Sequence, residues 1–334
     1  MSVFDSLLGR GQAGDRAVEA TAKVETPRLP SIGLALGGGA ARGFAHIGVL
    51  RKLVANGIRP DIISGTSIGA VVGGCYAAGY LDELEEWARS ITRRTVISYL
   101  DVSFTGSGLI NGNRLSRRLE LTLGPTRIEE LSTRFAAVAT EIDTGHEVWL
   151  TRGRMVDALR ASYALPGIFA PVRIGSRWLV DGALVNPVPV SAVRALDARL
   201  VIAVNLNSDL LGRGATIAAY GQDDTEQLPV EAETNGEENG WRGILNVERF
   251  LKRKVLSREG MPGIPAVMID AYNVMQDRIT RARLAGDPPD IMINPRLGPV
   301  AMFEFHRADE AIALGEEAAE RSLDAILQAM QALG

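Results

Sequence analysis

The sequence predicts an α/β protein with a mostly parallel central sheet. From Ser31 onward, short apolar runs alternate with segments of helical period, which is the pattern of successive strand–helix–strand crossovers. Parallel strands can be joined only by such crossovers, so helices are expected on both faces of the sheet. The chain has 334 residues, of which 46% are apolar and 23% are charged, and this is enough to bury the core of one large domain.

Each element is expected from its local pattern. Short apolar runs predict strands at residues 32–36, 62–64, 135–141, 147–151, 178–180, 200–205 and 291–293. Apolar residues at helical spacing predict helices at residues 41–56, 68–78, 247–257, 265–284 and 308–333. Gly57 and Gly79 are suitable ends for the first two helices. Residues 143–146 suit a hairpin turn between two strands.

The flanking segments differ from the core in composition. Residues 1–30 are polar and broken by Gly and Pro, so we expect a flexible N-terminal leader without a signal peptide. Residues 31–206 form the predicted core, and residues 207–334 a C-terminal extension that completes the domain. Within that extension, residues 222–240 hold seven acidic residues and no basic one, which indicates a flexible acidic loop.

Charge and cysteine content exclude several classes of protein. The net charge of −4 gives no overall positive field for nucleic acid. The single cysteine, Cys75, allows no internal disulfide, and no Cys/His cluster suggests zinc or another metal. The most apolar window, residues 68–81, is shorter than the roughly 20 residues that span a bilayer. We therefore expect a cytoplasmic protein that needs no metal or cofactor and lies, at most, peripherally on a membrane.

A candidate nucleophile lies in the pentapeptide Gly-Thr-Ser-Ile-Gly at residues 65–69. The motif falls between a predicted strand and a predicted helix, where a sharp turn would project the hydroxyl of Ser67 away from the sheet. The helix N-terminus behind it favours developing negative charge. The alternative is that Ser67 serves only as a helix N-cap.

A second candidate feature is the glycine run Gly37, Gly38 and Gly39, which follows the first predicted strand. Glycines expose backbone N–H groups, as an oxyanion hole or a phosphate cradle requires. A dinucleotide-binding loop would occupy the same place, but its G-x-G-x-x-G spacing is not met, because Arg42 or Ala40 falls on a required glycine. A glycine turn that only packs helix on strand is the remaining alternative.

A third feature is Asp181, which follows the predicted strand at 178–180 and precedes Gly182. Alone, an aspartate before glycine is usually a turn former. Its interest comes from occurring in one chain with the serine motif and the glycine run.

Taken together, the three features resemble the patatin-like phospholipase family, especially its bacterial members. The matching blocks, in chain order, are residues 36–50 (LGGGAARGFAHIGVL), 65–70 (GTSIGA), 161–171 (ASYALPGIFAP) and 181–190 (DGALVNPVPV). The resemblance implies a three-layer α/β/α fold with a patatin-like catalytic core at 31–206. It also implies a serine lipid acyl hydrolase of the phospholipase A, lysophospholipase or esterase type.

The resemblance assigns roles to specific residues of this chain. It implies Ser67 as nucleophile, Asp181 as base without a histidine, and Gly37, Gly38 and Gly39 as oxyanion hole. The chain departs from the family pattern at Ala40 and Ala183, where members often carry glycine. Ala40 would matter only if that position needs a left-handed backbone.

Several alternatives remain open from the sequence. His306 follows Ser67 and Asp181 in the order of an α/β-hydrolase triad. His46 and His146 are expected to be structural or solvated. Arg42 is a candidate contact for a substrate phosphate, with an ordinary ion pair as the alternative. A patatin-fold protein that binds lipid or regulates, with little turnover, is the second functional hypothesis.

Two lipid contacts are also predicted. Residues 241–258 can form a helix with one apolar side and with Arg242, Arg249 and Arg253 clustered on another, which suits docking on anionic lipid, although a core-facing helix is the simpler interpretation. The small residues Gly69, Gly73, Gly74 and Ala77 leave part of the helix after Ser67 without bulk. That surface either accommodates the acyl chain or packs closely on the sheet.

Overall fold

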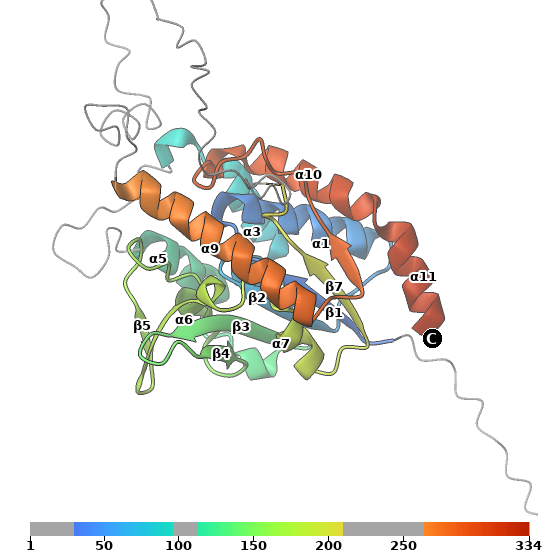
Figure 1. Ribbon diagram of the computed structural model, residues 1–334, viewed down its shortest axis with the longest axis horizontal. Coiled ribbons are helices and arrows are strands. Elements are labelled where there is room, and N and C mark those ends of the chain that lie inside the picture. Colours follow the sequence, from blue (N-terminus) through green and yellow to red (C-terminus); the bar gives the residue numbers. More distant parts are fainter. Residues whose placement is uncertain (1–29, 96–112, 210–263, 334) are drawn as a thin grey trace, which may run out of the picture.

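The computed structural model describes residues 30–95, 113–209 and 264–333 (Figure 1). Three predicted segments lie outside the described residues: the leader apart from Pro30, the acidic loop at 222–240, and residues 241–258 with their expected helix. Those predictions therefore stay predictions.

The described strands form one mixed sheet in the order β5-β6-β3-β2-β1-β7-β8, with β4 paired to β3. The strands are β1 (Ile32–Leu36), β2 (Ile62–Thr66), β3 (Arg134–Glu141), β4 (Glu147–Leu150), β5 (Val172–Ile174), β6 (Arg177–Asp181), β7 (Leu200–Val204) and β8 (Ile291–Ile293). The central strands β3, β2, β1, β7 and β8 pair in parallel. Strands β4, β6 and β5 add antiparallel pairs at one side.

The central strands are buried on both faces, and successive side chains point to opposite cores. Along β1, Leu34 and Leu36 belong to the larger core, whereas Ala35 belongs to the smaller one. Ile63 and Ile62 of β2 divide in the same way. This is why the sequence shows continuous apolar runs rather than an alternation of polar and apolar residues.

Helices surround the sheet (Figure 1). They are α1 (Ala45–Ala55), α2 (Ile68–Ala77), α3 (Leu81–Ser90), α5 (Asn113–Leu123), α6 (Met155–Ser162), α7 (Val190–Ala195), α9 (Ile264–Gly286), α10 (Ala308–Glu320) and α11 (Leu323–Leu333), with a 3-10 turn η1 (Ala40–Phe44) before α1. Residues of α1, α2, α3 and α10 fill the larger core. Residues of α7 and the end of α9 pack on the smaller core. The expected α/β fold with a mostly parallel sheet and flanking helices is confirmed.

Two expected helices differ in detail. The segment predicted as one helix at 41–56 begins as the 3-10 turn η1 and becomes α-helical only at Ala45. The terminal helix predicted at 308–333 is interrupted after Glu320 and continues as α11 from Leu323. Apolar periodicity runs through both interruptions, so it could not reveal them.

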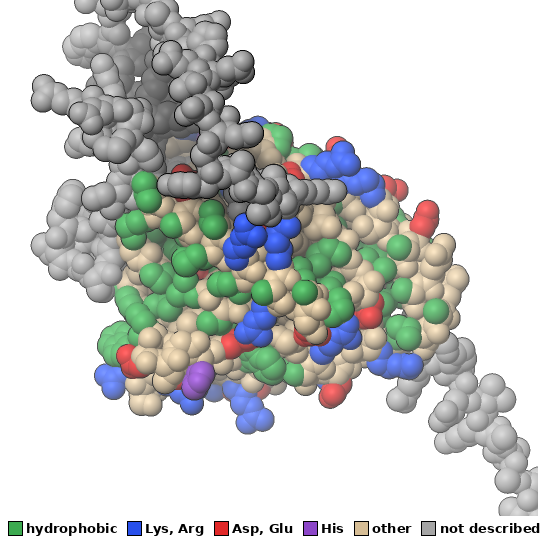
Figure 2. Space-filling model, in the orientation of Figure 1, with side chains coloured by type: hydrophobic (Ala, Val, Ile, Leu, Met, Phe, Trp, Pro, Cys, Tyr) green, Lys and Arg blue, Asp and Glu red, His purple; other side chains and the backbone are tan. Residues whose placement is uncertain are grey.

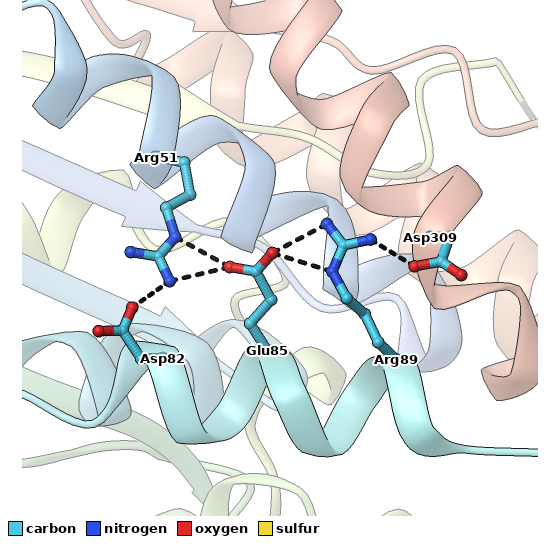
Figure 3. Close-up of polar contacts among 5 residues, drawn as sticks. All are labelled: Arg51, Asp82, Glu85, Arg89 and Asp309. Atoms are coloured by element: carbon cyan, nitrogen blue, oxygen red, sulfur yellow. Dashed lines mark hydrogen bonds and ion pairs between the residues drawn. The ribbon is translucent and has the colours of Figure 1, made fainter.

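A chain of ion pairs ties α3 to its neighbours (Figure 3). Glu85 of α3 accepts from Arg51 of α1 at 2.9 Å and from Arg89 at 2.8 Å. Arg51 also pairs with Asp82, and Arg89 reaches Asp309 on α10. The side chain of Glu85 is only 18% exposed, which places the centre of this network at the junction of three helices.

Hydrophobic and charged side chains are interspersed on the face that α9 crosses (Figure 2). Four large apolar side chains of α9 are exposed, namely Val267, Met268, Val274 and Met275. None of the helices in the described ranges is both long and apolar enough to cross a membrane.

Candidate active site

Ser67 lies at the abrupt change from β2 to α2. Its backbone has φ 56° and ψ −123°, a conformation that residues with a side chain rarely adopt. The turn is held because the N–H of Ser67 donates to Oγ of Ser162 at 2.9 Å, and this hydroxyl donates to the carbonyl of Val138 at 2.6 Å. Such strain costs about 1–3 kcal/mol and persists only where the surroundings enforce it.

The glycines of the serine motif are required by close packing. A methyl group on Gly65 would lie 2.4 Å from the backbone nitrogen of Ala70, and one on Gly69 would lie 2.2 Å from the carbonyl oxygen of Leu36. Both distances are far below van der Waals contact. Glycine at these positions therefore lets the turn sit tightly against the sheet.

Asp181 ends β6 and meets Ser67 directly. The hydroxyl of Ser67 donates to Oδ2 of Asp181 at 2.6 Å, and the N–H of Ala183 donates to Oδ1 at 2.8 Å. The Asp181 backbone is fixed as well, since its N–H donates to Ala164 and its carbonyl accepts from Thr140, both at 2.9 Å. The structure thus brings together the two residues that the sequence pointed to from 114 positions apart.

The carboxyl group of Asp181 is only 2% exposed. Burial raises its pKa to about 7, against the lowering effect of the hydrogen bonds from Ser67 and Ala183. A carboxylate with a pKa near neutrality is a much stronger base than one in water, yet it is still ionised in a useful fraction at neutral pH.

The glycine run adjoins the serine. A methyl group on Gly38 would lie 3.6 Å from Cβ of Ser67, so this glycine opens the space in front of the nucleophile. Two of the three predicted oxyanion donors are already used, because the N–H of Gly37 donates to Val204 at 3.1 Å and that of Gly38 donates to Pro187 at 3.0 Å. Within the described residues, the N–H of Gly39 has no such backbone acceptor. Of the three predicted donors, Gly39 is thus the one whose N–H is not engaged by a backbone acceptor among the described residues.

Ala40, one of the two departures from the family pattern, has φ 49°. Ala40 therefore has the left-handed backbone in which alanine is less favourable than glycine. Ala183, the other departure, is not among the described residues with positive φ.

The histidines lie away from the proton path between Ser67 and Asp181. His46 is fully buried in α1, where Nε2 contacts the carbonyl of Gly37 at 2.8 Å. Burial lowers the pKa of His46 to about 4, so it stays neutral and supports the glycine run. His306 instead accepts from Arg93 at 3.1 Å. His146 lies in the exposed turn between β3 and β4.

Arg42 is part of the scaffold in this structure. It is 5% exposed, and its guanidinium donates to the carbonyl of Val300 at 3.0 Å and to Oδ1 of Asn207 at 2.9 Å. These bonds use two of its five N–H groups, and the predicted phosphate contact stays a prediction.

Helix α2 packs tightly on the sheet at Gly73, one of the small residues predicted either to accommodate the acyl chain or to pack closely. A methyl group on Gly73 would lie 2.7 Å from the side chain of Ile63 and 3.0 Å from that of Leu36. The space beside Gly73 is therefore filled by the sheet, as the packing interpretation expects.

Ser162 and His46 are supports whose roles sequence reasoning did not assign. Ser162 lies in the block ASYALPGIFAP at 161–171, so the family resemblance marked its neighbourhood without its function. His46 lies within the block at 36–50, but no spacing rule connects it to the carbonyl of Gly37.

Comparisons with known proteins find several similarities. Residues 34–194 match the model of the patatin-like phospholipase family. An uncharacterised NTE family protein of Mycobacterium tuberculosis is 33% identical over 341 residues, covering 92% of this chain and 95% of the relative. Lysophospholipase NTE1 of Yarrowia lipolytica is 34% identical over 182 residues, covering 53% of this chain and 13% of the relative. Among solved structures, VipD from Legionella pneumophila is similar with a TM-score of 0.45 and 13% identity, over 90% of this chain and 67% of that chain.

Proposed function

Because the chain belongs to the patatin-like phospholipase family, we propose that it is a lipid acyl hydrolase in which Ser67 is the nucleophile and Asp181 the base. The observation that carries the proposal is the direct hydrogen bond of 2.6 Å from Ser67 to a buried carboxylate whose pKa is raised to about 7. The related lysophospholipase of Yarrowia lipolytica supports a lipid ester as the substrate.

The chemistry follows from the two side chains. Oγ of Ser67 attacks the ester carbonyl while its proton passes to Oδ2 of Asp181. The negative oxygen of the tetrahedral intermediate accepts hydrogen bonds from the glycine run, at Gly39 in particular. When the intermediate collapses, Asp181 returns the proton to the leaving alkoxide and an acyl-serine remains. Water then attacks the acyl group with Asp181 again as base, and the serine is regenerated.

The direct contact favours a dyad over a triad. In a triad, a histidine lies between the serine and the aspartate. Here both carboxylate oxygens of Asp181 are engaged, one by Ser67 and one by Ala183. The recorded hydrogen bonds of His46 and His306 are with Gly37 and Arg93, so neither histidine is recorded between Ser67 and Asp181.

A fluorophosphonate probe and a lipid panel test the proposal. We expect the full-length protein to be labelled, to hydrolyse short p-nitrophenyl esters and to release fatty acid from at least one phospholipid or lysophospholipid. The Ser67→Ala variant, folded by circular dichroism, should do none of these. Lipid binding without labelling or turnover by the wild type would contradict the hydrolase and favour a lipid-binding or regulatory role.

A further inference from the structure

Helix α9 buries three polar residues and exposes four large apolar ones alongside its charged side chains. Gln276, Asp277 and Thr280 are buried, whereas Val267, Met268, Val274 and Met275 are exposed. A helix that serves only to cover a core has the opposite arrangement. The buried polar side of α9 therefore calls for an explanation other than packing.

Gln276 and Ser67 both lie next to Gly38. The point that a methyl group on Gly38 would occupy is 3.6 Å from Cβ of Ser67, 3.6 Å from Cβ of Ala183 and 3.8 Å from Nε2 of Gln276. The side chains of Ser67, Ala183 and Gln276 thus lie around one point beside Gly38. If the glycine run stabilises the oxyanion, as proposed above, the carbonyl attacked by Ser67 lies close to this point.

The orientation of the Gln276 amide is fixed by a chain of hydrogen bonds. Arg42 is held by the carbonyl of Val300 at 3.0 Å and donates to Oδ1 of Asn207 at 2.9 Å. Nδ2 of Asn207 then donates to Oε1 of Gln276 at 3.3 Å and to the carbonyl of Gly38 at 3.3 Å. Because Oε1 is the acceptor end, the amide nitrogen is the end turned to Gly38.

The glycine run leaves the oxyanion short of donors, since the N–H groups of Gly37 and Gly38 are engaged by Val204 and Pro187. We propose that Gln276 is a catalytic residue that donates an N–H of its side-chain amide to the carbonyl oxygen of the substrate as that oxygen becomes negative. The proposal rests on the acyl hydrolysis proposed above and adds a donor from outside the family match at 34–194.

A neutral amide suits this position. It stabilises an oxyanion without placing a permanent positive charge beside Asp181, which would lower the pKa of the base. Tyr272, one turn earlier on α9, lies in the same region. Burial and then the charge of Asp181 raise the pKa of Tyr272 well above its usual value, while a hydrogen bond that Gln276 donates lowers it. A side-chain amide has two N–H groups, so one remains for the substrate.

Two substitutions of Gln276 in the full-length protein test the assignment. Gln276→Met keeps the volume but removes the donor, and Gln276→Glu keeps an acceptor for Asn207 but removes the donor at pH 8. Gln328→Met, at an exposed position of α11, is the matched control. Hydrolysis of p-nitrophenyl butyrate gives kcat and KM, and an alkyl trifluoromethyl ketone, whose adduct with Ser67 carries the oxyanion, gives an inhibition constant.

We expect kcat to fall by about 100-fold in both Gln276 variants with KM changed by less than about threefold. The trifluoromethyl ketone should lose affinity by a similar factor, and Gln328→Met should match the wild type. Should Gln276→Met fail to fold, Gln276→Glu decides. The assignment is overturned if a folded variant keeps its kcat and its affinity for the ketone, or if only KM and the melting temperature change, which would indicate a structural role. A wild type that neither turns over esters nor reacts with a fluorophosphonate would instead refute the hydrolase itself.

Discussion

At the scale of single residues, the strength of Asp181 as a base depends on how few hydrogen bonds its carboxylate accepts. It accepts one hydrogen bond from Ser67 and one from Ala183, and burial outweighs both in setting its pKa to about 7. The same burial that makes Asp181 a useful base makes its charged form costly to the folded protein.

The pH dependence of activity should reflect this carboxyl group. The base must be deprotonated, so kcat/KM should rise through pH 7 and be about tenfold lower at pH 6 than at pH 8. The measurement is a pH profile with p-nitrophenyl butyrate between pH 5 and pH 9. A rate that stays constant down to pH 5 would contradict the raised pKa of Asp181.

The stability of the folded protein should fall with rising pH, whereas the activity rises. An unfolded aspartate has a pKa of about 4, so between pH 4 and about 7 the folded protein holds this proton more tightly, and folding loses stability as the pH rises. Asp181→Asn removes the charge, and should therefore melt a few degrees above the wild type at pH 8 with a smaller gap at pH 5. Calorimetry at the two pH values checks it.

Ala40 and Ala183 should respond in opposite directions to glycine. Ala40 has φ 49°, so Ala40→Gly removes a strained conformation and should raise the free energy of unfolding by about 1 kcal/mol. Ala183 is fully buried without positive φ, so Ala183→Gly loses a packed methyl and should lower it by about 1 kcal/mol. Urea denaturation measures both. A loss of stability in Ala40→Gly would show that its backbone conformation is not strained.

At the scale of elements, helices α1 and α10 meet through glycines. A methyl group on Gly48 of α1 would lie 2.0 Å from the carbonyl of Ile312, and one on Gly315 of α10 would lie 2.0 Å from the carbonyl of Ala45. Neither backbone can yield without separating the helices. The ion pairs of Glu85 with Arg51 and of Arg89 with Asp309 brace the same helices from α3.

Gly315→Ala should lower the free energy of unfolding by about 2 kcal/mol, because the added methyl forces α10 away from α1. Gly286→Ala is the matched control. It lies at the end of α9 with no atom within 4 Å of an added methyl, and it should leave stability unchanged or raise it by less than about 1 kcal/mol. Equal urea midpoints for the two variants would show that the α1–α10 contact is looser than described.

Most strands could be located from the sequence, because buried parallel strands are continuous apolar runs bounded by turn residues. The described strands β1, β3, β7 and β8 lie within about one residue of the ranges expected. Helices α3, α5, α6 and α7 were not anticipated. Helix α3, for example, is only ten residues long and buries only Leu81, Leu84 and Ala88, so its amphipathic pattern is short and depends on its contacts with α1 and α10.

At the scale of the whole molecule, the fold joins features that lie far apart in the chain. Ser67 and Asp181 could be predicted because each sits in a recognisable local motif at the end of a strand. Gln276 and Asn207 could not, since nothing near them in sequence marks them. Their roles arise only because α9 crosses over the glycine run and brings Gln276 to Gly38.

The most direct test of the account is a mutant cycle on Ser67 and Asp181, measured as kcat for an ester that the wild type hydrolyses. Ser67→Ala and Asp181→Asn should each reduce kcat by about 1,000-fold or more, and the double variant should be scarcely worse than either, because both residues serve one step. His46→Ala, His146→Ala and His306→Ala, where folded, should keep most of the activity. A folded His306→Ala as inactive as Ser67→Ala would contradict the account, and Asp181 would then be the orienting member of a triad rather than the base.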